Sequence, residues 1–111
     1  VSPVYAVPPE ELARAAVAVL DGMERTRRVD DRGEPLRARF VARTRLMRFP
    51  DTVSLEAMPA DAAVETPASA IAIYSRSQLG RSDLGENRRR VERILADLAE
   101  RLPVREDGGP R

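Results

Sequence analysis

The stretch that decides the fold is LRARFVARTRLMRFPDTVSLEA, residues 36–57, in which apolar and polar residues alternate on both sides of a central turn. Successive side chains of a strand point to opposite faces of a sheet, so this period of two predicts two antiparallel strands that each bury one face. The opposite face carries arginines and is expected to be exposed to solvent. The apolar face carries Leu36, Ala38, Phe40 and Ala42, and then Val53, Leu55 and Ala57.

Further strands are predicted on both sides of this pair. Residues 4–7 form a short first strand, residues 24–30 a polar strand, and residues 68–74 a more apolar strand with its isoleucines in the core. The small residues at 58–67 predict a loop. A turn rich in aspartate, glycine and proline follows the polar strand, so a hairpin is expected there.

Two helices complete the architecture. Prolines and glutamates at the start of residues 9–22 favour a helix there, and a helix-spaced apolar stripe predicts another over residues 84–102. The order β-α-β-β-β-β-α predicts an α+β two-layer sandwich, with an antiparallel sheet of about four to five strands and both helices on one face. We expect residues 1–103 to form one domain and residues 104–111 to be a flexible tail.

Composition excludes several kinds of function. The 111 residues include 19 basic and 18 acidic ones. The resulting net charge of +1 argues against nonspecific electrostatic binding of nucleic acid. Neither cysteine nor histidine is present, which removes disulfides, thiolate nucleophiles, imidazole bases and the usual ligands of zinc, iron and copper. The sequence also shows no spaced acid pair or serine–base arrangement. We therefore expect a protein that is not an enzyme and that has no metal or cofactor.

A strand-to-helix turn, SRSQLGRSDLGENRRR at residues 75–90, has the composition of a binding site. Hydroxyls, guanidinium groups and the amides of a helix N-terminus together suit an anionic group. The candidate ligand- or partner-binding residues are Asp51, Ser75, Arg76, Ser77, Ser82, Asp83, Asn87 and Arg88. The candidate structural residues are Phe49, Pro50, Gly80, Gly85 and Arg90.

The same turn also has a structural interpretation. Asp83 and Glu86 fit a capping box, which satisfies the first amides of a helix without any ligand. Arg76 and Arg88 could pair with an acid instead of with a ligand, namely Asp51, Asp83 or Glu86. Asn87 could hold the preceding loop in place. Both interpretations stay open from the sequence.

A row of arginines shares the wet face of the strand at residues 36–45, and it too has two interpretations. It could meet phospholipid headgroups, an acidic partner protein or nucleic acid, or it could be solvated and pair across strands with Glu56 and Glu24. Two tyrosines, two phenylalanines and no tryptophan do not make a base-stacking platform, so no nucleic-acid partner is expected. The row consists of Arg37, Arg39, Arg43 and Arg45.

The turn resembles the signature of a bacterial and plastid family named domain of unknown function 1499, or DUF1499. The similar residues are Ser75, Arg76, Ser77, Gly80, Ser82, Asp83, Gly85, Asn87, Arg88 and Arg90, with Phe49, Pro50 and Asp51 similar to an upstream turn of the family. The family has no assigned activity, so the resemblance implies no catalytic residues. Many relatives carry hydrophobic N-terminal segments, which implies a membrane-anchored or exported protein.

These observations give one leading hypothesis and two alternatives. The leading one is a non-enzymatic binding or accessory module of a membrane-associated bacterial assembly, which recognises a partner protein or an anionic ligand at the turn of residues 75–90. The alternatives are a hydrolase or transferase that uses Asp51 and Asp83, and a purely structural accessory subunit. Because the chain begins with Val1, we expect a processed or trimmed product that is membrane-anchored or periplasmic through a preceding segment.

Overall fold

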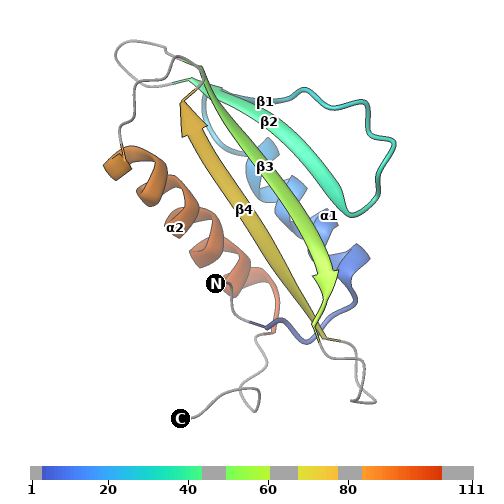
Figure 1. Cartoon of the computed structure of the whole chain (residues 1–111). Helices are drawn as coiled ribbons and strands as arrows, with labels where there is room; N and C mark the ends of the chain where they lie inside the picture. The colour runs from blue at the N-terminus through green and yellow to red at the C-terminus, as the bar shows by residue number, and fades with distance from the viewer. Residues whose placement is uncertain (1–3, 44–49, 61–67, 78–83, 104–111) are drawn as a thin grey trace.

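The computed structural model describes residues 4–43, 50–60, 68–77 and 84–103. The described elements form one antiparallel sheet in the strand order β1-β2-β3-β4, together with two helices (Figure 1). In chain order they are α1 (Pro9–Asp21), β1 (Thr26–Arg28), β2 (Arg37–Arg43), β3 (Pro50–Pro59), β4 (Ser69–Ser77) and α2 (Leu84–Arg101).

The local sequence accounts for the bounds of α1. Pro9 lies in the first turn, where its missing N–H group is not needed, and two glutamates follow at the positive end of the helix. Gly22 ends the helix, and its N–H group donates to the carbonyls of Ala18 and Val19, both at 3.2 Å. The buried face consists of Leu12, Ala13, Ala16, Val19 and Leu20, as the helical period predicts.

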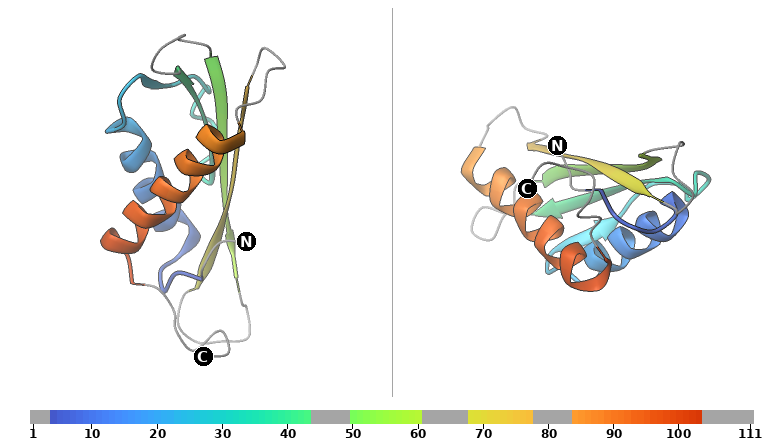
Figure 2. Two further views of the ribbon diagram at one scale, coloured as in Figure 1. Left: turned by 90° about the vertical axis from the view of Figure 1, so that its left-hand side faces the viewer. Right: turned by 90° about the horizontal axis from the view of Figure 1, so that it is seen from below.

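The alternation that predicted β2 and β3 is confirmed, because every second residue of both strands is buried. Phe40 lies directly opposite Val53, and neither side chain is exposed to solvent. Both helices cover this face of the sheet, whereas the other face is open (Figure 2). The predicted two-layer α+β architecture is therefore correct. The largest fully buried apolar side chains are Tyr5, Phe40, Leu12, Leu20, Ile94, Leu98 and Val53.

The predicted first strand at residues 4–7 is wrong, and α1 is the first regular element. Tyr5 makes only an isolated bridge with Ser69, through two backbone hydrogen bonds of 2.8 and 2.9 Å. The N–H group of the next residue, Ala6, donates to the Pro103 carbonyl at 2.9 Å, and α1 begins at Pro9, so the bridge is not extended into a strand. A side chain takes over instead, because the Ser69 hydroxyl donates to the Val7 carbonyl at 2.8 Å.

Three further differences concern element lengths and coverage. β1 spans Thr26–Arg28 and is shorter than the predicted residues 24–30, whereas β3 continues to Pro59 into the predicted loop. The predicted tail at residues 104–111 lies outside the described residues.

Among the residues that are described, no helix combines the length and the apolar composition needed to cross a membrane.

Candidate functional site

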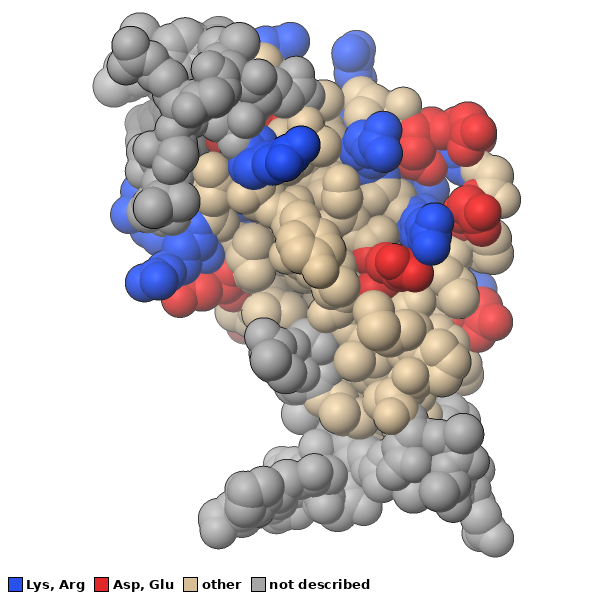
Figure 3. All heavy atoms as spheres, viewed as in Figure 1, with Lys and Arg blue, Asp and Glu red and all other residues tan. Residues whose placement is uncertain are grey.

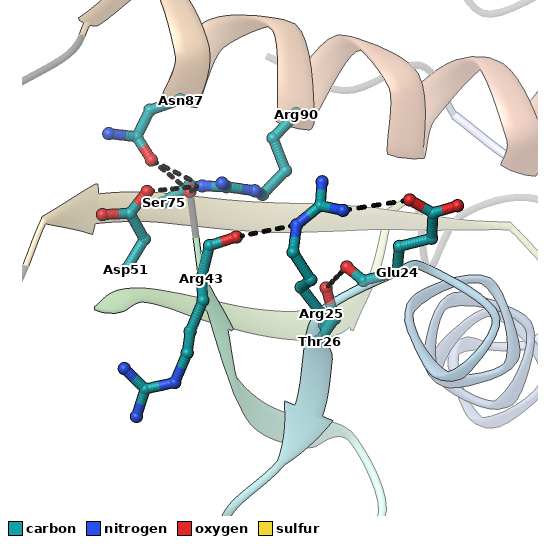
Figure 4. Close-up of polar contacts among 8 residues, drawn as sticks. All are labelled: Glu24, Arg25, Thr26, Arg43, Asp51, Ser75, Asn87 and Arg90. Atoms are coloured by element: carbon teal, nitrogen blue, oxygen red, sulfur yellow. Dashed lines mark hydrogen bonds and ion pairs between the residues drawn. The ribbon is translucent and has the colours of Figure 1, made fainter. Parts of the chain in front are cut away.

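Four polar residues meet on the covered face of the sheet, where α2 crosses the ends of β3 and β4 (Figure 4). Asp51 near the start of β3 is 3% exposed and Asn87 in α2 is 8% exposed. Ser75 lies on β4 opposite the buried Val53, so it belongs to the same face of the sheet. Arg90, one turn after Asn87, completes the group, which we call the buried network.

Arg90 is the centre of the buried network. Its Nη1 atom donates to Asp51 Oδ2 at 3.1 Å, to Ser75 Oγ at 2.9 Å and to Asn87 Oδ1 at 2.8 Å. The Ser75 hydroxyl in turn donates to Asn87 Oδ1 at 2.6 Å. The Arg90 and Asp51 side chains are only 8% and 5% exposed, so the ion pair is withdrawn from water. The network therefore joins β3, β4 and α2 with charges that cancel.

The structure brings together some of the predicted site residues and separates others. Ser75 and Asn87 are hydrogen-bonded to each other, and Arg90 connects both of them to Asp51. Asp51 pairs with Arg90 and not with Arg76 or Arg88. Arg76 is exposed and lies opposite Thr52, on the open face of the sheet. Arg88 is exposed as well. It lies two residues before Arg90, which corresponds to about 200° around the helix axis, so the two side chains point to opposite sides of α2.

The remaining predicted residues are placed only in part. Pro50 lies at the start of β3 opposite Arg43, and Ser77 lies opposite Asp51 in the strand register. Gly85 belongs to the first turn of α2. The expectations for Phe49, Gly80, Ser82 and Asp83, including the capping box, fall outside the described residues.

A cleft of about 420 Å³ opens beside the buried network, between α2 and the end of α1 with β1 and β2. Among the described residues that line it, five are arginines and one is a glutamate, so we call it the arginine cleft. Its lining consists of Met23, Glu24, Arg25, Thr26, Ala42, Arg43, Arg89, Arg90 and Arg93.

Arg25 lies in the arginine cleft with an unusual backbone conformation, and two hydrogen-bond acceptors hold its side chain. Its φ of 56° is in the left-handed region, which costs an L-residue about 1 kcal/mol. Its Nη1 atom donates to Glu24 Oε2 at 3.0 Å, and its Nε atom donates to the Arg43 carbonyl at 3.3 Å. The guanidinium of Arg43 itself points away from that of Arg25 (Figure 4).

The cations of the cleft differ in how they are neutralised. Arg90 is paired with Asp51 and Arg25 with Glu24. Arg89 and Arg93 are exposed, and within the described ranges neither guanidinium has a hydrogen-bond or ion-pair partner. Their spacing of four residues places them on one face of α2, where like charges repel. The cleft therefore presents two uncompensated guanidinium groups.

Sequence reasoning missed this cleft. The i, i+4 spacing of Arg89 and Arg93 was a signal that they share a face of α2. Nothing local indicated that Arg25 would lie across from them, since it is more than sixty residues away in the chain. The juxtaposition depends on how α2 lies on the sheet.

A second ion pair lies at the turn between β1 and β2. Arg28 donates from Nε to Asp30 Oδ1 at 2.7 Å and from Nη2 to Asp30 Oδ2 at 3.2 Å. Asp30 also accepts the backbone N–H groups of Arg39 and Arg32. The bonds from Arg28 have the largest effect on Asp30, and together with the two backbone bonds they hold the pKa of its carboxyl well below its usual range. The bonds to Asp30 likewise raise the pKa of Arg28. This pair orders the hairpin.

The comparison with protein families identifies the chain. A family described as protein of unknown function (DUF1499) matches residues 1–98. The chain belongs to the DUF1499 family. No curated protein and no solved structure matched it. The four residues of the buried network all belong to the DUF1499 pattern that the sequence resembles, so in this member that pattern builds an internal tie between the sheet and α2.

Proposed function

We propose that this DUF1499 protein is a non-enzymatic binding module that holds an anionic group in the arginine cleft. The observation that carries the proposal is the pair Arg89 and Arg93, which line the arginine cleft and have no ion-pair partner among the residues that the structure describes, since the one acid in the described lining, Glu24, is paired with Arg25. Arginine's planar fork matches the oxygens of phosphate and carboxylate, and an anion between the two side chains would relieve their repulsion.

The buried network supports this proposal by positioning the cleft. Because Arg90 is anchored to β3 and β4, the turn of α2 that carries Arg89 and Arg93 has a defined rotation relative to β1 and β2. A rigid support lowers the entropy lost when a ligand binds. The proposed ligand site therefore lies beside the residue 75–90 turn, displaced toward Arg25.

The two alternatives draw less support from the geometry. The Asp51 carboxylate is buried and engaged by Arg90, which leaves it poorly placed to reach a substrate as a base or nucleophile. A purely structural accessory role would leave the uncompensated charge of Arg89 and Arg93 without a purpose. A place in a membrane-associated assembly is a further part of the proposal, supported by the family resemblance; fractionation of the full-length protein from its native cells tests it.

Isothermal titration with sodium pyrophosphate tests the anion site. We expect the wild-type protein to bind and the Arg89→Gln/Arg93→Gln variant to lose about tenfold or more in affinity, with the melting temperature nearly unchanged. Arg88→Gln is the matched control, since Arg88 neighbours Arg89 in sequence but does not line the cleft. An equal loss in the control would move the site to the predicted turn, and no binding by the wild-type protein would remove the proposal.

A further inference from the structure

The open face of the sheet carries a second set of arginines around an exposed tyrosine. Tyr74 on β4 is 69% exposed, which is high for a large aromatic side chain. Ser54 lies directly opposite it on β3, and Arg39 lies opposite Ser54 on β2, so the three form one row across the sheet. With strands about 4.8 Å apart, Arg39 and Tyr74 are separated by only one small side chain.

A neighbouring row adds more positive charge. Arg76 lies opposite Thr52, which lies opposite Val41, which lies opposite Arg27. Within the described part of the chain, the guanidinium groups of Arg27, Arg39 and Arg76 have no ion-pair partner. The predicted cross-strand pair between Arg37 and Glu56 is present, at 3.3 Å, whereas Glu24 pairs with Arg25.

The charges on this face are unevenly distributed. Figure 3 views the open face and shows basic side chains above and beside its centre, with acidic ones gathered toward one side. A shallow hollow of about 690 Å³ lies beside Tyr74 and Arg39, and its lining includes four acids, Asp30, Asp31, Glu34 and Glu56. Asp30 is paired with Arg28 and Glu56 with Arg37. An acidic partner is therefore attracted to Arg39 on β2 and Arg76 on β4 and repelled by Asp31 and Glu34, which restricts its orientation on this face.

We propose that the open face docks an acidic, extended segment of a partner protein, with carboxylates on Arg39 and Arg76 and an apolar contact on Tyr74. Tyrosine and arginine are the residues that most often dominate protein interfaces, and the small Ser54 leaves the tyrosine ring accessible from above. A membrane surface is less suited, because the exposed large apolar residues of the described chain, Val29, Met58 and Tyr74, are scattered between strands.

Nuclear magnetic resonance titration with a ten-residue peptide of alternating glutamate and threonine tests this surface. In an extended peptide every second side chain lies on one face, about 6.8 Å apart, which matches the spacing of Tyr74 and Arg76 along β4. Arg39 lies two strands away across the sheet, about 9.6 Å from β4, within reach of a long glutamate side chain. We expect amide shifts at Ser54, Tyr74 and Arg76. The same peptide with glutamine in place of glutamate should not bind.

The variants separate this surface from general charge attraction. Arg39→Gln/Arg76→Gln should weaken peptide binding about tenfold, and Tyr74→Ala should also weaken it. Arg14→Gln/Arg101→Gln removes the same charge from exposed positions of the two helices and should change the Kd less than about twofold. Equal losses in the two double variants, shifts confined to the arginine cleft, or binding only to phosphatidylglycerol vesicles would overturn the proposal.

Discussion

The buried network and the arginine cleft lie side by side and use neighbouring residues of one helix, yet they treat charge in opposite ways. Arg90 is 8% exposed and shares its Nη1 atom among three acceptors. Arg89, the preceding residue, is exposed and has no partner among the described residues. Neighbouring arginines in one helix can therefore have different roles, one structural and buried, the other exposed, because each step along a helix rotates the side chain by about 100°.

The largest effect should follow from breaking the buried ion pair. Arg90→Met leaves the Asp51 carboxylate buried without a counter-ion, so we expect a loss of about 3–5 kcal/mol in the free energy of unfolding, measured by urea denaturation. Arg89→Met, one position away, should cost less than about 0.5 kcal/mol. The double variant Asp51→Val/Arg90→Met should recover most of the stability, since no charge is then buried. Equal costs for the two single variants would contradict the contrast.

The partly buried pair Arg28–Asp30 should show an intermediate effect that depends on pH. Asp30 has a folded-state pKa below its ordinary 3.8, so its contribution to stability is present above about pH 4 and is lost as the pH falls further. Asp30→Asn should cost about 1.5–3 kcal/mol at pH 7, the range for hydrogen bonds to charged groups. The difference between the variant and the wild type should shrink progressively from pH 4 to pH 2. A constant difference from pH 7 to pH 2 would show that the charge is not responsible.

Tyr5 contrasts with the buried network, because it is a buried polar group whose hydroxyl has no partner among the described residues. Its side chain is fully buried, its hydroxyl has no hydrogen-bond partner among the described residues, and burial raises its pKa. Tyr5→Phe removes the unsatisfied hydroxyl, so we expect stability to be unchanged or to rise by up to about 1 kcal/mol. Ser75→Ala is the matched contrast, since it removes a hydroxyl that both donates and accepts. Thermal unfolding that showed the opposite ranking would contradict this account.

The smallest effect should come from the cleft itself. Arg89→Gln/Arg93→Gln removes two repelling charges, so stability should change by no more than about 0.5 kcal/mol, in the stabilising direction at low salt. Unfolding at about 20 mM and 500 mM sodium chloride should show that this small gain disappears as salt screens the repulsion. A loss of stability in the variant would show that these arginines hold the fold and are not available to a ligand.

Much of the fold could be predicted because its signals are local. The alternation around Phe40 and Val53 follows from the two-residue period of a strand, and the stripe of α2 follows from the helical period. The strand predicted at residues 4–7 failed because only Tyr5 pairs with the sheet, the Ala6 N–H group donates to Pro103 instead, and α1 begins at Pro9. Asp51, Ser75 and Asn87, which belong to the family pattern, all bind Arg90 in the structure.

The candidate site could be predicted only in part. Arg76 and Arg88 were assigned to it with Asp51 because they lie close together at one turn, and that assignment did not take into account that Arg76 and Arg88 are on other faces of β4 and α2 than the residues that bind Asp51. Arg25 entered the cleft from a distant segment, which no periodicity in the chain indicates.

By itself, the sequence determined the α+β class, the two strand faces, the helical stripes and the lack of cysteine and histidine chemistry. These depend on local geometry and on composition. Only the tertiary structure decided that Arg90 is buried on Asp51, that Arg89 and Arg93 face Arg25 across a cleft, and that Arg39 and Tyr74 share the open face. The physical reason is that these contacts depend on the rotation of α2 over the sheet and on strand register, and both are settled by packing of the whole core.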